Sequence, residues 1–522
     1  MTREERTMGE FLPLLLIASV LTILLSCGLK AFYSLWWKPK ALEKKLKKQG
    51  IKGNPYRLLY GDMKDEIRAI KEAWSKPITL THQIVPRVAP FAYHTVQKYG
   101  KTSLMWVGTT PRVILWDPEM IREVLLDKLG RFQKQRLNPL VLLLTRGVST
   151  LKGEEWTKRR RVITPAFHLE KLKGMVPAFL TSCVDLIKRW QNLTSTGGSC
   201  ELDIWPEFQN LTGDVISRTA FGSSYEEGKK IFELQKEQAV LVMEAARAPY
   251  MPGFRFLPTA KNRRRMNIDR EIKTMLKNMI DKKLNSMKMG GSLGTDLLGL
   301  LLQLSNDNDQ KNYRITIDEV IEECKLFYFA GQETTSAWLT WTMILLSIHP
   351  DWQQRAREEV MKICGKNTPD FESVGHFKIV TMILYEVLRL YPPLTSLFRH
   401  AIKKTKLGEF TIPAGTDVWL PAILIHHDRE FWGEDAEEFN PQRFSEGVSR
   451  ASKVQNAFFP FGGGPRICLG QSFAAIEAKM ALATILQHFS FELSPSYAHA
   501  PYTIITLQPQ FGAHIILHQL LY

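Results

Sequence analysis

The stretch that decides the fold is Phe461-Gly462-Gly463-Gly464-Pro465-Arg466-Ile467-Cys468-Leu469-Gly470. Its three consecutive glycines allow the backbone to approach a flat ligand closely, and Arg466 can bind carboxylates through its guanidinium group. Cys468 stands just before an apolar helix that is predicted over residues 471–488. Backbone N–H groups at a helix N-terminus stabilise a thiolate, the form in which sulfur binds a metal. A lone cysteine is more often an inert buried thiol, so other motifs in the chain must show whether Cys468 binds a metal.

The stretch resembles the haem-binding loop of the cytochrome P450 superfamily, F-x-x-G-x-R-x-C-x-G, whose fixed positions are filled by Phe461, Gly464, Arg466, Cys468 and Gly470. The resemblance implies that the Cys468 thiolate is the axial ligand of a haem b iron. It assigns Arg466 to a haem propionate and Phe461 to shielding of the sulfur. It also implies a mainly α fold with small β-sheets.

A second motif of that superfamily is Ala330-Gly331-Gln332-Glu333-Thr334-Thr335, inside a long apolar helix. Gly331 leaves room for dioxygen, and Glu333 and Thr334 supply a carboxylate and a hydroxyl for catalytic proton delivery. An acid beside threonines usually makes only local hydrogen bonds to the helix backbone. Because this pair interrupts an apolar run, we favour the catalytic role and, with it, oxygen activation.

A third motif is Glu386-x-x-Arg389, whose spacing places both charges on one helical face. Most such pairs are exposed and contribute little to stability. In the superfamily the pair is buried and is joined by an arginine from a later loop, which is Arg443 in this chain. We expect the three residues to be structural and to hold the core beside the haem.

Trp156 and Arg160 form a W-x-x-x-R pair that directs an indole N–H and a guanidinium group to the same region. The resemblance assigns both to haem propionates, together with Arg399. The neighbouring cations are expected to form a solvated basic face that helps to dock an acidic electron donor; they are Lys158, Arg159 and Arg161.

The N-terminus predicts a membrane anchor. Residues 11–29 carry no charge and are long enough to cross a bilayer, whereas residues 30–50 form a basic juxtamembrane linker. The excess of lysine after the apolar run places residues 1–10 in the lumen of the endoplasmic reticulum and the catalytic domain in the cytosol. A buried soluble helix would show a polar face, which this run lacks.

The rest of the chain, residues 51–522, is expected to be one large haem-binding catalytic domain. Helix-type patterns dominate it, at residues 185–193, 228–245, 267–287, 317–348, 351–363, 379–390 and 471–488. Short strands are expected at residues 103–107, 112–116, 406–412 and 417–421, and a polar loop at residues 305–313. The six cysteines are too dispersed for a disulfide framework, which favours a reducing compartment.

The formal net charge of +16 indicates an anionic partner. Because the basic run beside the anchor has no interleaved aromatic residues, anionic lipid is a simpler partner than nucleic acid. No flavin, nicotinamide or nucleotide motif is present, so the electrons are expected to come from an NADPH-cytochrome P450 reductase in the same membrane.

Four further segments resemble the plant clan that contains secologanin synthase, whose members oxidise terpenoids: residues 38–40, 53–57, 327–333 and 499–502. The expected activity is therefore a monooxygenase that inserts oxygen into a hydrophobic terpenoid in plant secondary metabolism. Walls of the pocket are proposed at residues 137–145, 329–330, 394–397 and 504–507, which are mostly apolar. The alternative is a membrane-anchored haem protein that binds a lipid or sterol without turnover, although such a protein needs no proton-delivering pair.

Overall fold

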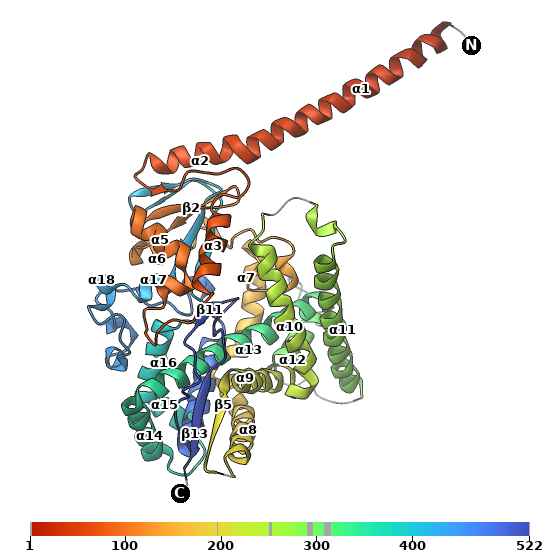
Figure 1. Ribbon diagram of the computed structural model, residues 1–522. Coiled ribbons are helices and arrows are strands. Elements are labelled where there is room, and N and C mark those ends of the chain that lie inside the picture. The colour runs from red at the N-terminus through yellow and green to blue at the C-terminus, as the bar shows by residue number, and fades with distance from the viewer. Residues whose placement is uncertain (1–2, 196, 250–252, 290–295, 307–314, 521–522) are drawn as a thin grey trace.

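The structure is a computed structural model that describes residues 3–195, 197–249, 253–289, 296–306 and 315–520. Helices form most of the molecule and the strands form small sheets, which confirms the expected mainly α fold (Figure 1). Helix α1 projects from the body like an arm, and the C-terminal end lies on the opposite side of the molecule.

The α-helices of the described residues are α1 (Arg3–Phe32), α2 (Lys38–Lys47), α3 (Met63–Ala73), α4 (Val85–Val88), α5 (Pro90–Tyr99), α6 (Pro118–Leu125), α7 (Gly153–Ile163), α8 (Leu169–Thr194), α9 (Ile204–Phe221), α10 (Tyr225–Ala246), α11 (Ala260–Lys288), α12 (Leu297–Asn306), α13 (Ile317–Ile348), α14 (Pro350–Cys364), α15 (Phe371–His376), α16 (Ile379–Leu390), α17 (Ala422–His426), α18 (Arg429–Trp432) and α19 (Gln471–His488). A π-helix, η1 (Tyr33–Trp37), joins α1 to α2, and the short 3-10 helices are η2 (Val141–Leu143), η3 (Thr164–Phe167), η4 (Phe254–Phe256), η5 (Pro441–Phe444), η6 (Val448–Arg450) and η7 (Gly464–Arg466).

Each helix expected from periodicity is present, and the bounds of α13, α16 and α19 agree with the expected ones. Helix α8 begins sixteen residues before the expected start at residue 185, at Leu169. The early part was hidden by Gly174 and Pro177, which are poor helix formers; burial of Leu172 and Phe179 offsets their cost. Of the expected polar loop at residues 305–313, residues 307–313 lie outside the described residues, and residues 305–306 end α12.

The strands form four small sheets. Six of them make a mixed sheet in the order β1-β2-β3-β9-β6-β4, and β10-β13-β5 form an antiparallel sheet, with β11-β12 and β7-β8 as separate hairpins. The strands are β1 (Lys52–Gly53), β2 (Ser103–Val107), β3 (Thr110–Ile114), β4 (Phe132–Gln133), β5 (Ser199–Asp203), β6 (Leu397–Ala401), β7 (Thr405–Leu407), β8 (Phe410–Ile412), β9 (Asp417–Leu420), β10 (Phe489–Leu493), β11 (Pro501–Thr503), β12 (Leu507–Pro509) and β13 (His514–Gln519).

One expected strand was wrong. Residues 406–412 form the β7-β8 hairpin, in which Leu407 pairs with Phe410 across a turn. Gly408 has φ +55°, a conformation that glycine adopts readily and that reverses the chain. The turn residues Gly408 and Glu409 therefore divide the apolar run into two short strands.

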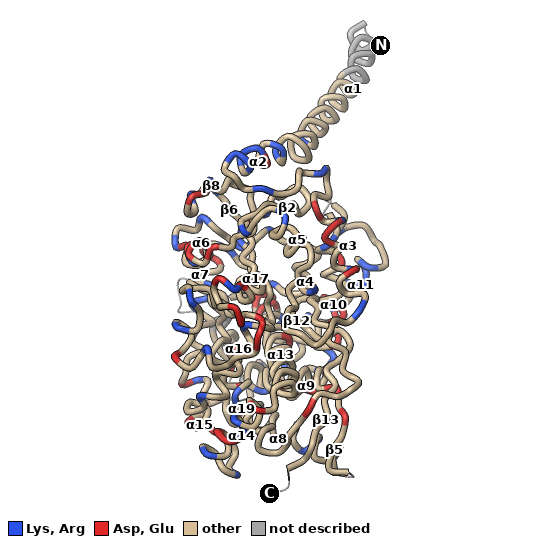
Figure 2. Tube along the Cα trace, turned by 60° about the vertical axis from the view of Figure 1, so that its left-hand side comes forward, with Lys and Arg blue, Asp and Glu red and all other residues tan. Residues whose placement is uncertain are grey.

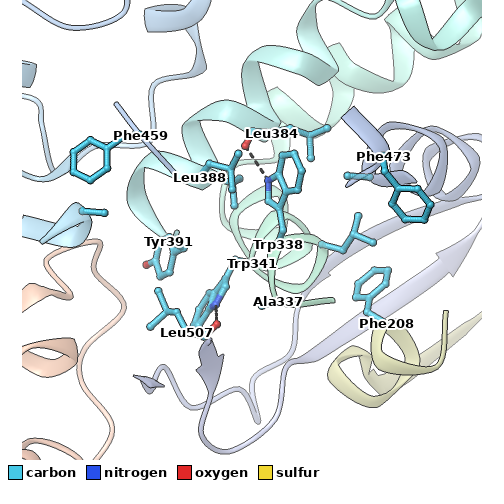
Figure 3. Close-up of a cluster of buried hydrophobic side chains, with 14 of the residues drawn as sticks. Phe208, Ala337, Trp338, Trp341, Leu384, Leu388, Tyr391, Phe459, Phe473 and Leu507 are labelled. Atoms are coloured by element: carbon cyan, nitrogen blue, oxygen red, sulfur yellow. Dashed lines mark hydrogen bonds between the residues drawn. The ribbon is translucent and has the colours of Figure 1, made fainter. Parts of the chain in front are cut away.

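Helix α13 runs through the centre of the body and organises the core. Its indole side chains bind the backbone of neighbouring elements: Trp338 Nε1 donates to Leu384 O at 3.0 Å, and Trp341 Nε1 donates to Leu507 O at 2.9 Å (Figure 3). Both tryptophans are at most 2% exposed. Because α13 is fixed in this way to α16 and to β12, side chains on its other faces are held at defined positions.

The N-terminal segment differs from the expected basic linker. Residues Leu15–Lys47 form the one stretch of the described residues that is helical, long and apolar enough to cross a membrane. Its last part, α2, packs on the body through Leu42 and Leu46, while Tyr56 Oη donates to Leu35 O at 2.6 Å. The exposed face of α2 carries lysines, which Figure 2 shows gathered beside the arm. The basic segment is therefore a docked helix, because it has apolar residues to bury.

Candidate active site

The motif around Cys468 folds into a closed turn between η7 and α19. The Cys468 N–H donates to Phe461 O at 2.9 Å, and the Phe461 ring lies edge-on to Trp338 of α13, with 5.9 Å between the ring centroids. Gly470 is the N-cap of α19, and its backbone N–H donates to the Cys468 sulfur. This turn thus presents a thiol at the N-terminus of a helix, as the sequence predicts.

Two opposing effects act on the Cys468 thiol. Burial raises its pKa above the ordinary 9.0, whereas the Gly470 N–H and the nearby Arg160 charge lower it. The side chain is nevertheless accessible to water, unlike Cys183 and Cys324, which lie in the core. A side chain that is both enclosed by protein and accessible lies at the wall of an internal space, where a ligand can reach the sulfur.

A glycine is required at position 464 by the packing of the loop on α6. Its φ is +64°, and a Cβ there would lie 2.2 Å from the backbone oxygen of Leu125 at the end of α6. A Cβ at Gly463 would also meet Leu125, at 3.3 Å. These two glycines therefore let the loop approach α6 closely, in addition to the expected approach to a flat ligand.

The arginines predicted to bind propionates come together beside this turn. The Arg466 guanidinium lies 4.2 Å from the centroid of the Trp156 ring, and Arg466 Nη2 donates to Leu151 O at 3.0 Å. Burial, together with repulsion from Arg399 and Arg160, lowers the pKa of Arg466 to about 10. The pKa of Arg399 also falls to about 10, because its side chain is buried.

Sequence reasoning missed a fourth cation of this group, Lys134, which follows β4. Burial lowers its pKa to about 7, with added repulsion from Arg399 and Arg466. No carboxylate of the described residues forms an ion pair with Lys134, Arg160, Arg399 or Arg466. A cluster of four cations, of which Arg399 is buried and the other three are half-buried, has no ion-pair partner among the described residues and fits a ligand that carries carboxylates, as a haem does through its propionates. Lys134 belongs to no recognisable spacing pattern, so only the tertiary structure reveals it.

The predicted acid of α13 is held by the β11-β12 hairpin. Glu333 Oε1 accepts hydrogen bonds from Thr506 Oγ1 at 2.9 Å and from Gln508 Nε2 at 2.5 Å. Burial raises the pKa of Glu333 above 4.5, while these donors lower it. The carboxyl group is thus fixed in position by two side chains of the hairpin. Thr506 and Gln508 carry no sequence signal of this contact, because they lie more than 170 residues away.

The neighbours of Glu333 have other contacts. Thr334 Oγ1 donates to Ala330 O at 2.8 Å, so its hydroxyl is satisfied within its own helix. A Cβ at Gly331 would lie 2.7 Å from Cγ1 of Ile216 on α9. Gly331 therefore allows α9 to pack closely on α13. We expect Gly331 to leave space for dioxygen, and the sequence does not predict this packing role.

The residues of the third motif meet in the core as expected. Arg389 binds Glu386 through two hydrogen bonds, Nε–Oε2 at 2.8 Å and Nη2–Oε1 at 2.7 Å, and neither side chain is exposed. Arg389 also donates to the backbone oxygens of His426, Ala436 and Glu438. Arg443 Nε lies 3.5 Å from Glu386 Oε1 and Arg443 Nη1 donates to Trp432 O at 2.9 Å, so the three side chains tie α16 to the loop before η5.

One cation of the expected basic face is buried. Arg159 is 2% exposed and forms ion pairs with Glu323, at 2.8 Å, and Glu319, at 2.5 Å. Residues 159 and 161 point in different directions on a helix. The Arg159 side chain therefore lies on the side of α7 that faces α13, while Arg161 does not. Arg161 is exposed, as predicted, and Lys158 is paired with Glu154 at 2.7 Å.

Three of the regions proposed as pocket walls lie together. Leu144, Val141, Phe329 and Ile505 belong to a small apolar cluster that is separate from the main core. The same cluster contains Ala239 and Val242 of α10, which sequence reasoning did not include. Segments far apart in the chain thus form an apolar surface beside the glutamate of α13.

The comparisons with known proteins agree with this geometry. The sequence model of the family "Cytochrome P450" matches residues 87–511. Among curated relatives, "Cytochrome P450 CYP72A616" of Paris polyphylla is 57% identical over 93% of this chain and 95% of the relative. "7-deoxyloganic acid hydroxylase" of Catharanthus roseus is 52% identical over 93% of this chain and 95% of its own length. "Secologanin synthase 1" of the same plant is 49% identical over 96% and 97%, respectively.

A thiol in a Gly-rich turn, a cluster of enclosed cations and an acid on a central helix are the groups that a haem-thiolate enzyme needs, and the family model assigns that class. The chain belongs to the cytochrome P450 family. It is a monooxygenase that contains a haem with thiolate-bound iron, receives electrons from a redox partner and acts on a hydrophobic substrate. The alternative of a haem protein without turnover gains no support from these comparisons.

Proposed function

We propose that this chain oxidises a terpenoid in the membrane of the endoplasmic reticulum, with a haem b bound through Cys468. The observation that supports this assignment is that the Cys468 thiol lies close to a group of buried and half-buried cations that form no ion pair with a carboxylate of the described residues. The residues that hold the propionates are Trp156, Arg160, Arg399 and Arg466, joined by Lys134. Phe461 shields the sulfur, and Gly464 and Gly470 shape the turn around it.

The haem, when bound, supplies the activation of dioxygen. The chain contributes proton delivery through the Glu333 carboxyl, which Thr506 and Gln508 hold in place, and through the Thr334 hydroxyl. Thr334 now donates to Ala330 O and must rotate away from it to pass a proton. Glu386, Arg389 and Arg443 are structural: they fix the end of α16 against the loop that leads to Cys468.

The proposed substrate is a terpenoid, bound against the apolar cluster of Val141, Leu144, Val242, Phe329 and Ile505. Such a surface suits a hydrocarbon skeleton, because burial of apolar area provides most of the binding free energy. The names of two relatives support this class of substrate, since one states the hydroxylation of 7-deoxyloganic acid and another the synthesis of secologanin.

We assign residues 1–10 to the lumen, 11–29 to the membrane, 30–50 to the basic juxtamembrane segment and 51–522 to a cytosolic catalytic domain. The exposed lysines of α2 lie where they can contact anionic lipid headgroups. The electron donor is an NADPH-cytochrome P450 reductase in the same membrane. Arg161 and Lys158 remain candidates for docking the reductase. Arg159 is not a candidate, because it is buried.

The experiment uses the full chain in membranes with that reductase. A reduced carbon monoxide difference spectrum should show the band of thiolate-bound haem, and Cys468→Ala should abolish it. NADPH consumption with a panel of terpenoids, followed by mass spectrometry, should reveal a product that contains one added oxygen atom. The haem assignment is wrong if Cys468→Ala keeps the band, and the substrate class is wrong if only non-terpenoid compounds are converted.

A further inference from the structure

Residues 140–151 form a thin wall between two different environments. On the inner side, Val141 and Leu144 belong to the apolar cluster that also contains Phe329. On the outer side, Arg146, Gly147 and Leu151 line a cleft of about 730 Å³ that opens between this segment, α11 and α13. This segment thus lies between the apolar cluster of the proposed substrate pocket and the cleft, and Val148 also joins it to the main core.

Two buried charged side chains of α13 hold the backbone of this wall. Lys325 Nζ donates to Leu143 O at 3.2 Å, and Glu323 Oε2 accepts from the Val148 N–H at 3.1 Å. Neither Glu323 nor Lys325 is exposed. A Cβ at Gly147 would lie 2.5 Å from Glu323, so the wall approaches this carboxylate as closely as a glycine allows. The two contacts fix the wall at points five residues apart.

Both side chains are themselves held by ion pairs. Glu323 binds Arg159 at 2.8 Å, and Lys325 binds Asp269 at 2.5 Å and Glu322 at 3.1 Å. A buried charge is strongly destabilising when its partner is removed, so these side chains have few alternative positions. Phe329, which lies four residues after Lys325 on the same helix, forms the facing wall of the pocket. Helix α13 therefore sets the distance between the two walls.

We propose that Glu323 and Lys325 are positioning residues that hold the 140–151 wall and thereby limit the size of the ligand that the pocket accepts. The inference rests on the substrate pocket proposed above. Without these contacts the wall has space to move outward into the cleft, and the pocket enlarges. Bulky ligands then gain affinity relative to small ones, while the haem environment stays the same.

The test compares two nitrogen ligands of haem iron that differ in size, 1-methylimidazole and clotrimazole, by optical titration of the full chain. The variants are Glu323→Ala and the double variant Lys325→Met, Asp269→Asn. The matched control is Lys283→Met, Asp296→Asn, which removes an ion pair of 2.5 Å at the other end of α11. In both wall variants the ratio of the clotrimazole Kd to the 1-methylimidazole Kd should fall about tenfold, or about 1.4 kcal/mol, and in the control it should stay unchanged.

Amide hydrogen exchange gives a second measurement. Peptides that cover residues 140–151 should exchange faster in the wall variants and at the native rate in the control. If Glu323→Ala loses its haem, Glu323→Gln is used in its place, because glutamine keeps the side-chain shape and can keep one of the contacts to Val148 and Arg159. Glu323→Gln should change the Kd ratio in the same direction by a smaller factor. An unchanged Kd ratio with intact haem, or an equal change in the control, overturns the inference alone. A native chain whose spectrum does not respond to 1-methylimidazole overturns the proposed function and this inference with it.

Discussion

The Glu333 carboxylate of α13 accepts a hydrogen bond from Thr506, with 2.9 Å between Oε1 and Oγ1. This contact joins the central helix to the turn of the β11-β12 hairpin, where Ile505 belongs to the apolar cluster. The acid proposed for proton delivery and a wall of the proposed pocket are therefore adjacent. A ligand that contacts the hairpin can therefore change the position of the Glu333 carboxylate.

Thr506→Val should reduce product formation several-fold, as expected from the loss of one hydrogen bond of about 1 kcal/mol. Thr506 lowers the pKa of Glu333, so its removal raises that pKa further. Because Glu333 must carry a proton to deliver it, the basic limb of the pH–activity profile should move to higher pH. The control is Thr503→Val in the same hairpin, because the Thr503 hydroxyl is buried and has no hydrogen-bond partner in the described part of the chain. An unshifted profile in Thr506→Val would contradict this role of Glu333.

Arg399→Met should have opposite effects with and without haem. It removes a cation that repels Arg466 and Lys134, so the haem-free chain should become more stable. It also removes a charge-assisted contact of about 1.5–3 kcal/mol to a propionate, so haem transfer to excess apomyoglobin should become about 10- to 100-fold faster. Arg161→Met, at an exposed position of α7, serves as the control and should change neither quantity. Unaltered haem transfer in Arg399→Met would place the propionates elsewhere.

Glu386→Ala should prevent the chain from accumulating as a folded protein. It leaves Arg389 without its carboxylate in a fully buried position, a change that costs about 3–5 kcal/mol. Glu154→Ala, which breaks the exposed pair with Lys158, should cost less than about 1 kcal/mol. Protease resistance and the amount of haem-containing protein measure both effects. Equal losses in the two variants would show that burial of the Glu386 pair does not matter.

Gly331→Ala and Gly464→Ala should both destabilise the protein, but only the first should be rescued. The new Cβ at residue 331 meets a side chain, Cγ1 of Ile216 at 2.7 Å, so Ile216→Ala in addition should restore much of the lost stability. At residue 464 the Cβ meets the Leu125 backbone oxygen at 2.2 Å and φ is +64°, so truncating the Leu125 side chain should not help. Unfolding midpoints in urea of the single and double variants measure this difference.

Glu477→Gln should stabilise the protein, and more so as the pH rises. Burial raises the pKa of this α19 carboxyl well above its ordinary value of 4.5, so the folded chain keeps a proton that the unfolded chain releases. Stability therefore falls by about 1.4 kcal/mol for each pH unit above 4.5, until the folded-state pKa is reached. Glutamine has nearly the same shape and no proton to lose. Urea unfolding between about pH 5 and about pH 8 should show a growing advantage of the variant; a constant difference would mean that Glu477 is ionised in the folded chain.

Local patterns predicted the long helices well. Helix α13 has an apolar run flanked by a polar start, where Thr316 and Glu319 form a capping box, and its bounds agreed with the periodicity. Helix α8 was only partly predicted, because its packing against the core offsets the unfavourable Gly174 and Pro177. The strands β5 and β13 were missed because each is short and the two pair with each other from distant parts of the sequence.

The sequence alone determined the class of protein and the chemical groups of the site, because the spacing of Phe461, Arg466 and Cys468 is local and is preserved when the chain folds. Only the tertiary structure decided which charges are buried together. It brought Lys134 to Arg466, Thr506 to Glu333, and Arg159 to Glu323. These contacts join residues that are far apart in the chain, so their energies depend on burial and distance, which arise only when the helices pack around α13.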